Sequence, residues 1–231
     1  FTPFLLTSPH FSFYFNSPSL FSYRRYSIHD DDPRLILNSL RQQCKLGFSN
    51  IEQPLSLYHE LNSLRPFSSI IDFGMLFTAM LKIKPFPPFA TVISLSRQLH
   101  LSGLRPNLYS LNIVANCYCS LGHVDLGTGN NAGALKLLRN MESHGRCMPD
   151  VVIYNTIIDS LCKAQLLSQA LRVLAEMKSK GIPPNVITNT SLIRGMCTTG
   201  HWKEAEVYWT EMLQNDILLS IEAYNLLIDM H

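Results

Sequence analysis

Short polar side chains recur at fixed places along this sequence, and the chemistry they offer is hydrogen bonding. Asn155 and Thr190 lie 35 residues apart, and so do Asn185 and Ser220. An asparagine amide both donates and accepts hydrogen bonds, whereas threonine and serine contribute a rotatable hydroxyl. Helix caps and turns use the same residue types, so two interpretations stand at this point: local backbone chemistry or contact with a polar ligand.

Residues that could catalyse a reaction do not occur at useful spacings. His123, His144 and His201 are scattered. Neither a carboxylate pair nor a nucleophile with a neighbouring base stands out at a useful spacing. Asp159 and Glu176 are interpreted as charges on solvated helix faces. We therefore expect that the protein is not an enzyme and that it needs no cofactor or metal.

The cysteines lack the spacing of a secreted disulfide framework or a zinc site. Cys117 and Cys119 have no second paired motif, while Cys162 and Cys197 are 35 residues apart. We interpret them as small apolar residues packed in helices, which fits a reducing compartment.

The polar positions belong to a repeat of 35 residues. The repeat relates the pairs Val151 and Val186, Ile158 and Ile193, Cys162 and Cys197, Ala170 and Ala205, and Met177 and Met212. Inside one unit, apolar residues recur at i, i+3, i+4 and i+7, which is the pattern of one helix face. A fixed period of this length predicts an all-α fold, an α-α superhelical solenoid of two-helix 35-residue repeats.

Turn residues and the period divide the chain into segments. We expect an organellar transit peptide, disordered, at 1–29, degenerate lead-in helices at 30–69, repeats at 70–107, 151–185 and 186–220, an irregular repeat at 108–150 and a truncated repeat at 221–231. The irregular unit has 43 residues, and four glycines between Gly122 and Gly133 predict a loop there. We interpret this unit as two merged repeats. A nucleotide-binding loop is disfavoured because no Gly-Lys-Ser/Thr follows.

The first 29 residues differ in composition from the rest. They contain no Asp or Glu, are rich in serine and include Arg24 and Arg25. This pattern is typical of an organellar transit peptide and predicts a mitochondrial location, with the chloroplast as the alternative. Prolines at 3, 9 and 18 argue against a membrane-spanning helix. Because the chain opens with Phe1 instead of Met, we expect a longer natural protein.

Overall composition is that of a core-forming chain. Hydrophobic residues make up 46% and charged residues 16% of the 231 residues, which is typical of a globular protein and not of a disordered one. The formal net charge of +2 does not indicate a strongly basic binder of polyanions.

One complete unit, at 151–185, resembles the pentatricopeptide repeat. The matching residues are Val-Val-Ile-Tyr-Asn-Thr-Ile-Ile-Asp-Ser-Leu-Cys-Lys, followed by Ala-Leu, Met and Gly-Ile-Pro-Pro-Asn. The resemblance is strongest over 151–220, and 111–125 is similar to early repeats of plant restorer-of-fertility-like members of the P class. The chain lacks both the 34-residue period and the Trp, Leu-Gly and Tyr pattern of tetratricopeptide repeats.

The resemblance implies binding of single-stranded RNA, one base per repeat. It implies base reading by Asn112 with Asp150, Asn155 with Asn185 and Thr190 with Ser220, base stacking by Tyr109, Val152 and Ile187, and phosphate contacts from Lys82 and Lys163. The family's pairing rules would give uracil, a pyrimidine with cytosine favoured, and adenine for the three pairs in turn. Gly74 departs from the pattern because it has no side chain that could read a base. Thr198 and Ser120 replace the family's basic residue.

We therefore expect a sequence-selective, single-stranded RNA-binding adaptor in an organelle, acting in transcript processing, stability or translation. Its expected partners are organellar RNA and RNA-processing proteins, with no membrane and no small-molecule substrate. The alternatives are a protein-binding helical-repeat scaffold or a non-functional truncated fragment. Of these three hypotheses, only the RNA-binding adaptor predicts salt-sensitive, sequence-selective binding to RNA.

Overall fold

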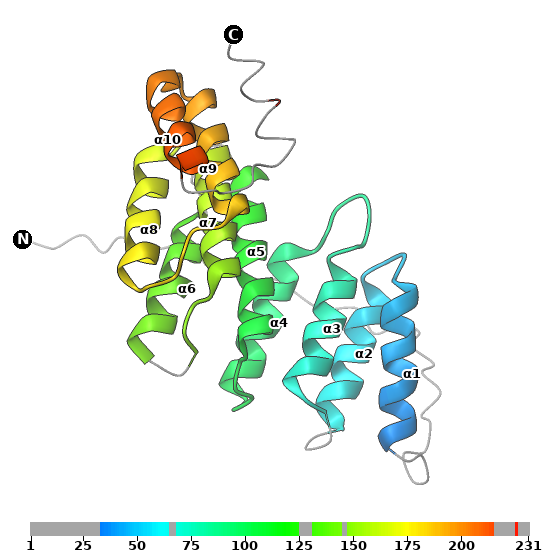
Figure 1. The fold of residues 1–231 in the computed structure, drawn as a ribbon. Coiled ribbons are helices and arrows are strands. Elements are labelled where there is room, and N and C mark those ends of the chain that lie inside the picture. Colours follow the sequence, from blue (N-terminus) through cyan, green and yellow to red (C-terminus); the bar gives the residue numbers. More distant parts are fainter. Residues whose placement is uncertain (1–32, 65–67, 125–130, 145–146, 215–224, 226–231) are drawn as a thin grey trace, which may run out of the picture. The chain divides into compact units, whose positions relative to one another are not determined.

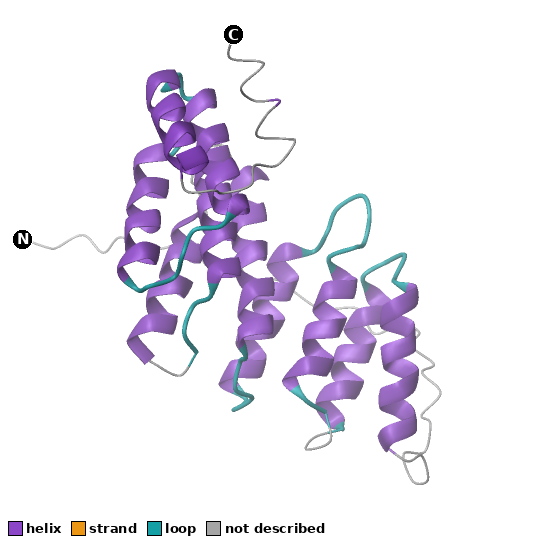
Figure 2. Cartoon of the chain, in the orientation of Figure 1, coloured by secondary structure: helices purple, strands orange, loops and turns teal. Residues whose placement is uncertain are grey.

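The structure, a computed structural model, describes residues 33–64, 68–124, 131–144, 147–214 and 225. In these ranges all regular structure is helical (Figures 1 and 2), with the helices α1 Pro33–Leu46, α2 Glu52–Ser63, α3 Ile70–Met80, α4 Phe89–Leu101, α5 Leu108–Val124, α6 Asn131–His144, α7 Val151–Lys163, α8 Leu167–Ser179, α9 Val186–Thr198 and α10 Trp202–Gln214. The predicted transit peptide lies outside the described residues, and so does the predicted truncated repeat except for Asn225. No described helix is both long and apolar enough to cross a membrane.

The odd-numbered helices form one continuous series. α1 packs against α3, α3 against α5, α5 against α7, and α7 against α9. The even-numbered helices contact this series from α2 onwards: α8, for example, packs against both α7 and α9 (Figure 1). The prediction of an all-α solenoid is thus confirmed, and the odd-numbered helices are the elements that position the candidate site.

Helix α7 shows why the repeat sequence folds in this way. Tyr154, Ile157, Ile158 and Leu161 are all at most 1% exposed and form its buried face. The Asp150 carboxylate caps the helix by accepting a hydrogen bond from the backbone N–H of Ile153 at 3.0 Å. Its partner α8 ends before Gly181, which has the positive φ of +73° that a helix-terminating glycine adopts.

The irregular unit is more helical than its composition predicts. The prediction of a loop from Gly122 to Gly133 is wrong at both ends, because α5 continues to Val124 and α6 begins at Asn131. Ala134, Leu138 and Met141 are buried on one face of α6, so packing stabilises a helix that its glycine content disfavours. Asn131 is itself buried and accepts a hydrogen bond from the Ser160 hydroxyl at 2.7 Å.

The cysteines give a test of this packing. All six are free thiols, and only Cys147 is not buried. Burial raises the pKa of Cys44 to about 11 and that of Cys162 to about 12, so both stay protonated at neutral pH. We expect iodoacetamide at pH 8 to modify the native chain at Cys147 first, and all six sites only after unfolding. Peptide mass spectrometry measures this order, and equally rapid labelling of Cys162 in the native chain would contradict the packing of α7 against α9.

Candidate nucleic-acid interface

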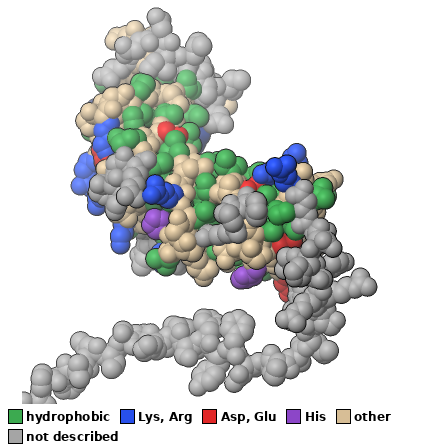
Figure 3. Space-filling view, turned by 90° about the horizontal axis from the view of Figure 1, so that it is seen from below, with side chains coloured by type: hydrophobic (Ala, Val, Ile, Leu, Met, Phe, Trp, Pro, Cys, Tyr) green, Lys and Arg blue, Asp and Glu red, His purple; other side chains and the backbone are tan. Residues whose placement is uncertain are grey.

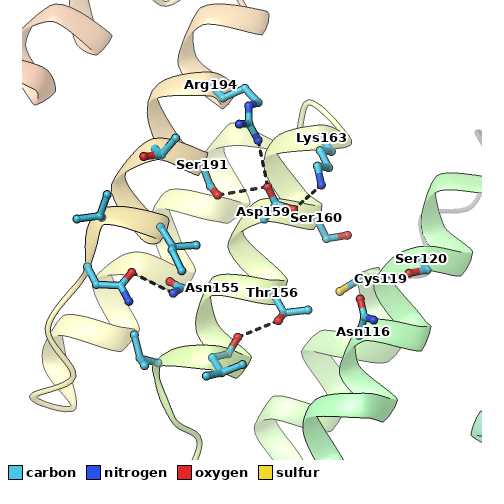
Figure 4. Close-up of a pocket in the computed structure, with 16 residues that line it drawn as sticks. Asn116, Cys119, Ser120, Asn155, Thr156, Asp159, Ser160, Lys163, Ser191 and Arg194 are labelled. Atoms are coloured by element: carbon cyan, nitrogen blue, oxygen red, sulfur yellow. Dashed lines mark hydrogen bonds and ion pairs between the residues drawn. The ribbon is translucent and has the colours of Figure 1, made fainter. Parts of the chain in front are cut away.

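Helices α5, α7 and α9 line a hollow of about 620 Å³, which we call the α5–α7–α9 hollow (Figure 4). It contains several of the predicted site residues: Val152, Asn155, Lys163, Asn185, Ile187 and Thr190. These residues come from two consecutive units. The period therefore brings apolar, hydrogen-bonding and cationic side chains together on one face of the helix series.

Large apolar side chains remain exposed at the same place in successive units. Val152 is 49% exposed and Ile187 is 60% exposed, although folding buries most residues of these types. Tyr109, at the corresponding place in the preceding unit, is 42% exposed. Exposed apolar side chains in a hollow offer a flat ligand a surface for stacking and apolar contact.

Asn155 and Asn185 form one hydrogen-bonded network with Thr188. The Asn155 amide nitrogen donates to Oδ1 of Asn185 at 3.1 Å, a bond drawn in Figure 4. The Thr188 hydroxyl donates to Oδ1 of Asn155 at 2.5 Å. Asn185 also caps α9, because its Oδ1 accepts from the backbone N–H of Thr188 at 3.1 Å. The predicted pair of site residues is therefore in direct contact, and helix capping and a binding role are compatible at Asn185.

The other two predicted pairs are different. Thr190 is 6% exposed and lines the hollow, but its predicted partner Ser220 lies outside the described residues. No hydrogen bond joins Asn112 to Asp150, whose carboxylate caps α7. Oδ1 of Asn112 is buried without a hydrogen-bond partner, and neither residue lines the hollow. The structure thus assembles one complete predicted pair, Asn155 with Asn185.

The ring of Tyr109 fills the space beside Gly74, which has no side chain. A Cβ atom at Gly74 would lie 2.6 Å from Cε1 of Tyr109, so the tyrosine ring fills the place where a larger residue would project. The Tyr109 hydroxyl is hydrogen-bonded to that of Thr78 at 2.7 Å, which holds the ring against α3.

Charged residues meet at one end of the hollow. The Asp159 carboxylate is 2.6 Å from Nζ of Lys163 and 3.7 Å from Nη1 of Arg194, and it accepts a hydrogen bond from Ser191 at 3.2 Å (Figure 4). Asp159 is therefore the centre of an ion cluster, and its side chain remains 28% exposed. Glu176 also pairs, with Lys180 at 3.0 Å.

Arg194 is a candidate site residue that sequence reasoning missed. It lies one period after Asp159 and four residues before Thr198, which replaces the family's basic residue. The sequence did contain a signal for this residue, because Arg194 lies one helical turn from position 198, where a basic residue was expected. Lys163 is 50% exposed in the hollow, whereas Lys82, the other predicted phosphate contact, is exposed in the turn after α3 and outside the hollow.

The cysteine that lines the hollow is not an activated nucleophile. Cys119 lines it, but burial raises the pKa of this thiol to about 11, so it is protonated and a poor nucleophile at neutral pH. Within the described part of the chain, no group of three or more His, Cys, Asp or Glu side chains could hold a metal ion. The arrangement is suited to binding by contact and hydrogen bonding.

Comparison with known proteins identifies the repeat. A model of the PPR repeat family matches residues 149–198, and a second PPR repeat model matches 190–217. Residues 149–217 of the chain are thus pentatricopeptide repeats. A relative in Arabidopsis thaliana, the mitochondrial pentatricopeptide repeat-containing protein At1g62680, is 37% identical over 76 residues, which is 33% of this chain and 13% of the relative. Further matched relatives from the same plant carry mitochondrial or chloroplastic names.

Solved pentatricopeptide repeat structures share the fold. The maize protein PPR10 in complex with an 18-nt psaJ RNA element matches with a TM-score of 0.65 and 22% identity, over 85% of this chain and 27% of that one. The PPR domain of Arabidopsis thaliana protein-only RNase P 1 in complex with tRNA matches with a TM-score of 0.69 and 14% identity, over 86% and 98% of the two chains. These similarities support the pentatricopeptide solenoid fold.

Proposed function

We propose that this chain binds single-stranded RNA across α5, α7 and α9 and acts as an adaptor in a plant organelle. The observation that carries the proposal is the convergence of Val152, Ile187, Asn155 and Asn185 on one hollow. Several matched relatives carry mitochondrial or chloroplastic names, and PPR10 has been solved with RNA. The chain spans 13% of the first of these relatives, so the outcome of binding is proposed for the longer protein: processing, stability or translation of a transcript.

The hollow fits a nucleotide in three respects. Val152 and Ile187 provide exposed apolar surface for contact with base faces in the same hollow as the Asn155–Asn185 pair. The asparagine amides provide hydrogen bonds for a base edge. Lys163 and Arg194 provide positive charge for the phosphates.

The base assignments follow the same three pairs. We propose cytosine, with uracil as the weaker choice, at Asn155 with Asn185, uracil at Asn112 with Asp150, and adenine at Thr190 with Ser220. Only the first pair is hydrogen-bonded in the structure. We therefore expect it to make the largest single contribution to sequence selectivity.

Few Lys and Arg side chains are available to contact RNA phosphates at the hollow. On the face shown in Figure 3, Lys and Arg side chains lie in separate groups and not in one broad patch. With few phosphate contacts, we expect affinity to fall only modestly with salt. For about two neutralised phosphates the slope of log K against log salt would be about −1.4 on single strands.

Fluorescence anisotropy with the full chain tests the proposed function. The probes are a single-stranded ten-nucleotide RNA of random sequence and a duplex of the same length, each at 50 and 200 mM NaCl. We expect the single strand to bind more tightly than the duplex, and Lys163→Ala to weaken binding to every sequence and to reduce the salt slope. Lys45→Ala, on the exposed surface of α1, serves as a matched control because it removes a cation outside the hollow. Absence of RNA binding, or equal affinity for the duplex, would overturn the proposal and favour a protein-binding scaffold or an inactive fragment.

A further inference from the structure

The Asn155–Asn185 pair is fixed by a third residue, Thr188, which no base contact requires. We propose that Thr188 is a positioning residue: its hydroxyl holds the amide of Asn155 so that the pair presents only N–H donors to the hollow, which selects cytosine. This inference rests on the proposed RNA-binding function and names the residue that determines selectivity at one of its positions. Thr188 is fully buried, so it acts through Asn155 and does not touch a base itself.

The backbone of α9 sets the direction of the whole network. The backbone N–H of Thr188 can only donate, and it lies 3.1 Å from Oδ1 of Asn185, so this oxygen must face the helix. The backbone N–H of Asn185 in turn donates to the Thr188 hydroxyl at 3.1 Å. The amide nitrogen of Asn185 is thereby directed away from the cap.

Thr188 then fixes Asn155. With its oxygen accepting from Asn185, the Thr188 hydroxyl donates its proton to Oδ1 of Asn155 at 2.5 Å. The Asn155 nitrogen donates to Oδ1 of Asn185 at 3.1 Å. A flipped Asn155 amide would place two carbonyl oxygens against each other and leave the Thr188 hydroxyl facing an NH₂ group. Both carbonyl oxygens of the pair are therefore occupied within the protein, and the remaining hydrogens of the two amides are donors.

A pair of donors matches one base better than the others. On its Watson–Crick edge cytosine has two adjacent acceptors, N3 and O2. In uracil the N3–H donor separates the acceptors O4 and O2, adenine has a single acceptor beside its amino group, and guanine has N1–H beside O6. Buried polar groups that meet the wrong partner are left unpaired, which is the source of strong discrimination.

The preceding unit shows the arrangement without a hydroxyl. There Asp150 caps Ile153 in the way that Asn185 caps Thr188, but isoleucine has no hydroxyl to donate. In that unit Oδ1 of Asn112 is buried with no hydrogen-bond partner. The two units thus differ in this hydroxyl, which we infer to be decisive, as well as in the capping residue, which is Asp150 in one unit and Asn185 in the other.

The test compares Thr188→Ala with Thr188→Ser, because both variants lose the γ-methyl group and only alanine loses the hydroxyl. Each full-length variant and the unchanged chain are incubated with a pool of random ten-nucleotide single-stranded RNAs, and the bound RNAs are sequenced. We expect the unchanged chain and Thr188→Ser to enrich cytosine at one motif position. In Thr188→Ala the preference for cytosine over uracil at that position should fall about five- to tenfold, the effect of one buried hydrogen bond, with the other positions unchanged.

Each outcome has a definite meaning. Thermal unfolding by circular dichroism establishes that the variants are folded, and Thr188→Val, which keeps the side-chain volume, replaces Thr188→Ala if the alanine variant does not fold. Unchanged cytosine preference without the hydroxyl, or an equal loss of preference at all positions, would overturn the role of Thr188 alone. Failure of the unchanged chain to enrich any RNA sequence would overturn the proposed function and this inference with it.

Discussion

Replacing Tyr154 with alanine should lower the free energy of unfolding by about 3–5 kcal/mol, the usual range for removing a large buried aromatic side chain. Tyr154 is 0% exposed and packs in the core that α5, α6, α7 and α8 share. Its loss would leave a cavity in the middle of the helix series, where neighbouring helices cannot close without shifting α7. Urea unfolding monitored by circular dichroism measures the change.

The Tyr154 hydroxyl provides the matched control. It donates to Oε1 of Glu142 at 3.2 Å, and Glu142 also pairs with Lys180, which pairs with Glu176. Tyr154→Phe keeps the ring and removes only this hydrogen bond, so we expect a loss of about 1.5–3 kcal/mol, the range for hydrogen bonds to charged groups. A loss in Tyr154→Ala no larger than that in Tyr154→Phe would contradict the assignment of the ring to the core.

Much of the fold followed from the sequence because the buried positions are periodic. The spacing of i, i+3, i+4 and i+7 predicted one apolar helix face, and the residues at these places in α7 are all buried: Tyr154, Ile157, Ile158 and Leu161. A period records which positions are apolar, and in a solenoid each unit packs only on its neighbours. Sequence alone therefore predicts the architecture without any long-range contact having to be known.

The next unit shows where this reasoning ends. Asn189 stands one period after Tyr154, and a polar residue in the core position is a departure from the pattern. The structure explains it: Asn189 is 2% exposed, and its Oδ1 accepts a hydrogen bond at 2.9 Å from Tyr208, which reaches back from α10. In this unit the aromatic ring comes from the partner helix. The residue that compensates for the missing tyrosine therefore lies at another place in the repeat, where the periodicity does not reveal it.

The candidate site divides in the same way. The resemblance to the pentatricopeptide repeat implied roles for Val152, Asn155, Asn185 and Ile187, and the structure gathers these residues around one hollow. Their contact with RNA bases remains a prediction. The roles of Thr188 and Arg194 depend on side-chain geometry between units: which oxygen accepts from which hydroxyl, and which cation shares a carboxylate. Such relations are not encoded in the spacing of residue types.

A second large effect is expected at Asp72, which joins the first two odd-numbered helices. Its side chain is 1% exposed, and its carboxylate lies 2.8 Å from Nη2 of Arg41 on α1. It also accepts hydrogen bonds from the backbone N–H and the hydroxyl of Ser69, at 3.0 and 2.8 Å, in the capping box that begins α3. One carboxylate thus serves as a helix cap and as a buried ion-pair partner.

Asp72→Ala should lower the free energy of unfolding at pH 7 by about 2–4 kcal/mol, since it removes both the cap and the ion pair. Arg41→Ala leaves the carboxylate buried with only Ser69 as its donor, so this variant should be destabilised as well. Because the two residues share one interaction, the loss in the double variant should be smaller than the sum of the two single losses. Additive losses in urea unfolding would contradict a direct interaction between Asp72 and Arg41.

The same group predicts the response to acid. Burial alone would raise the pKa of Asp72, but the hydrogen bonds from Ser69 and the Arg41 guanidinium outweigh it, so the pKa lies below its ordinary value. A carboxyl whose pKa is lower in the folded state stabilises the fold fully above its unfolded pKa of about 4, and this stabilisation is lost as pH falls through the lower folded value. The stability difference between the unchanged chain and Asp72→Ala should therefore be constant from pH 7 to about 5 and shrink below about pH 4. A difference that grows as pH falls would mean that Asp72 is held in its protonated form, and the ion pair with Arg41 could then not be what joins α1 to α3.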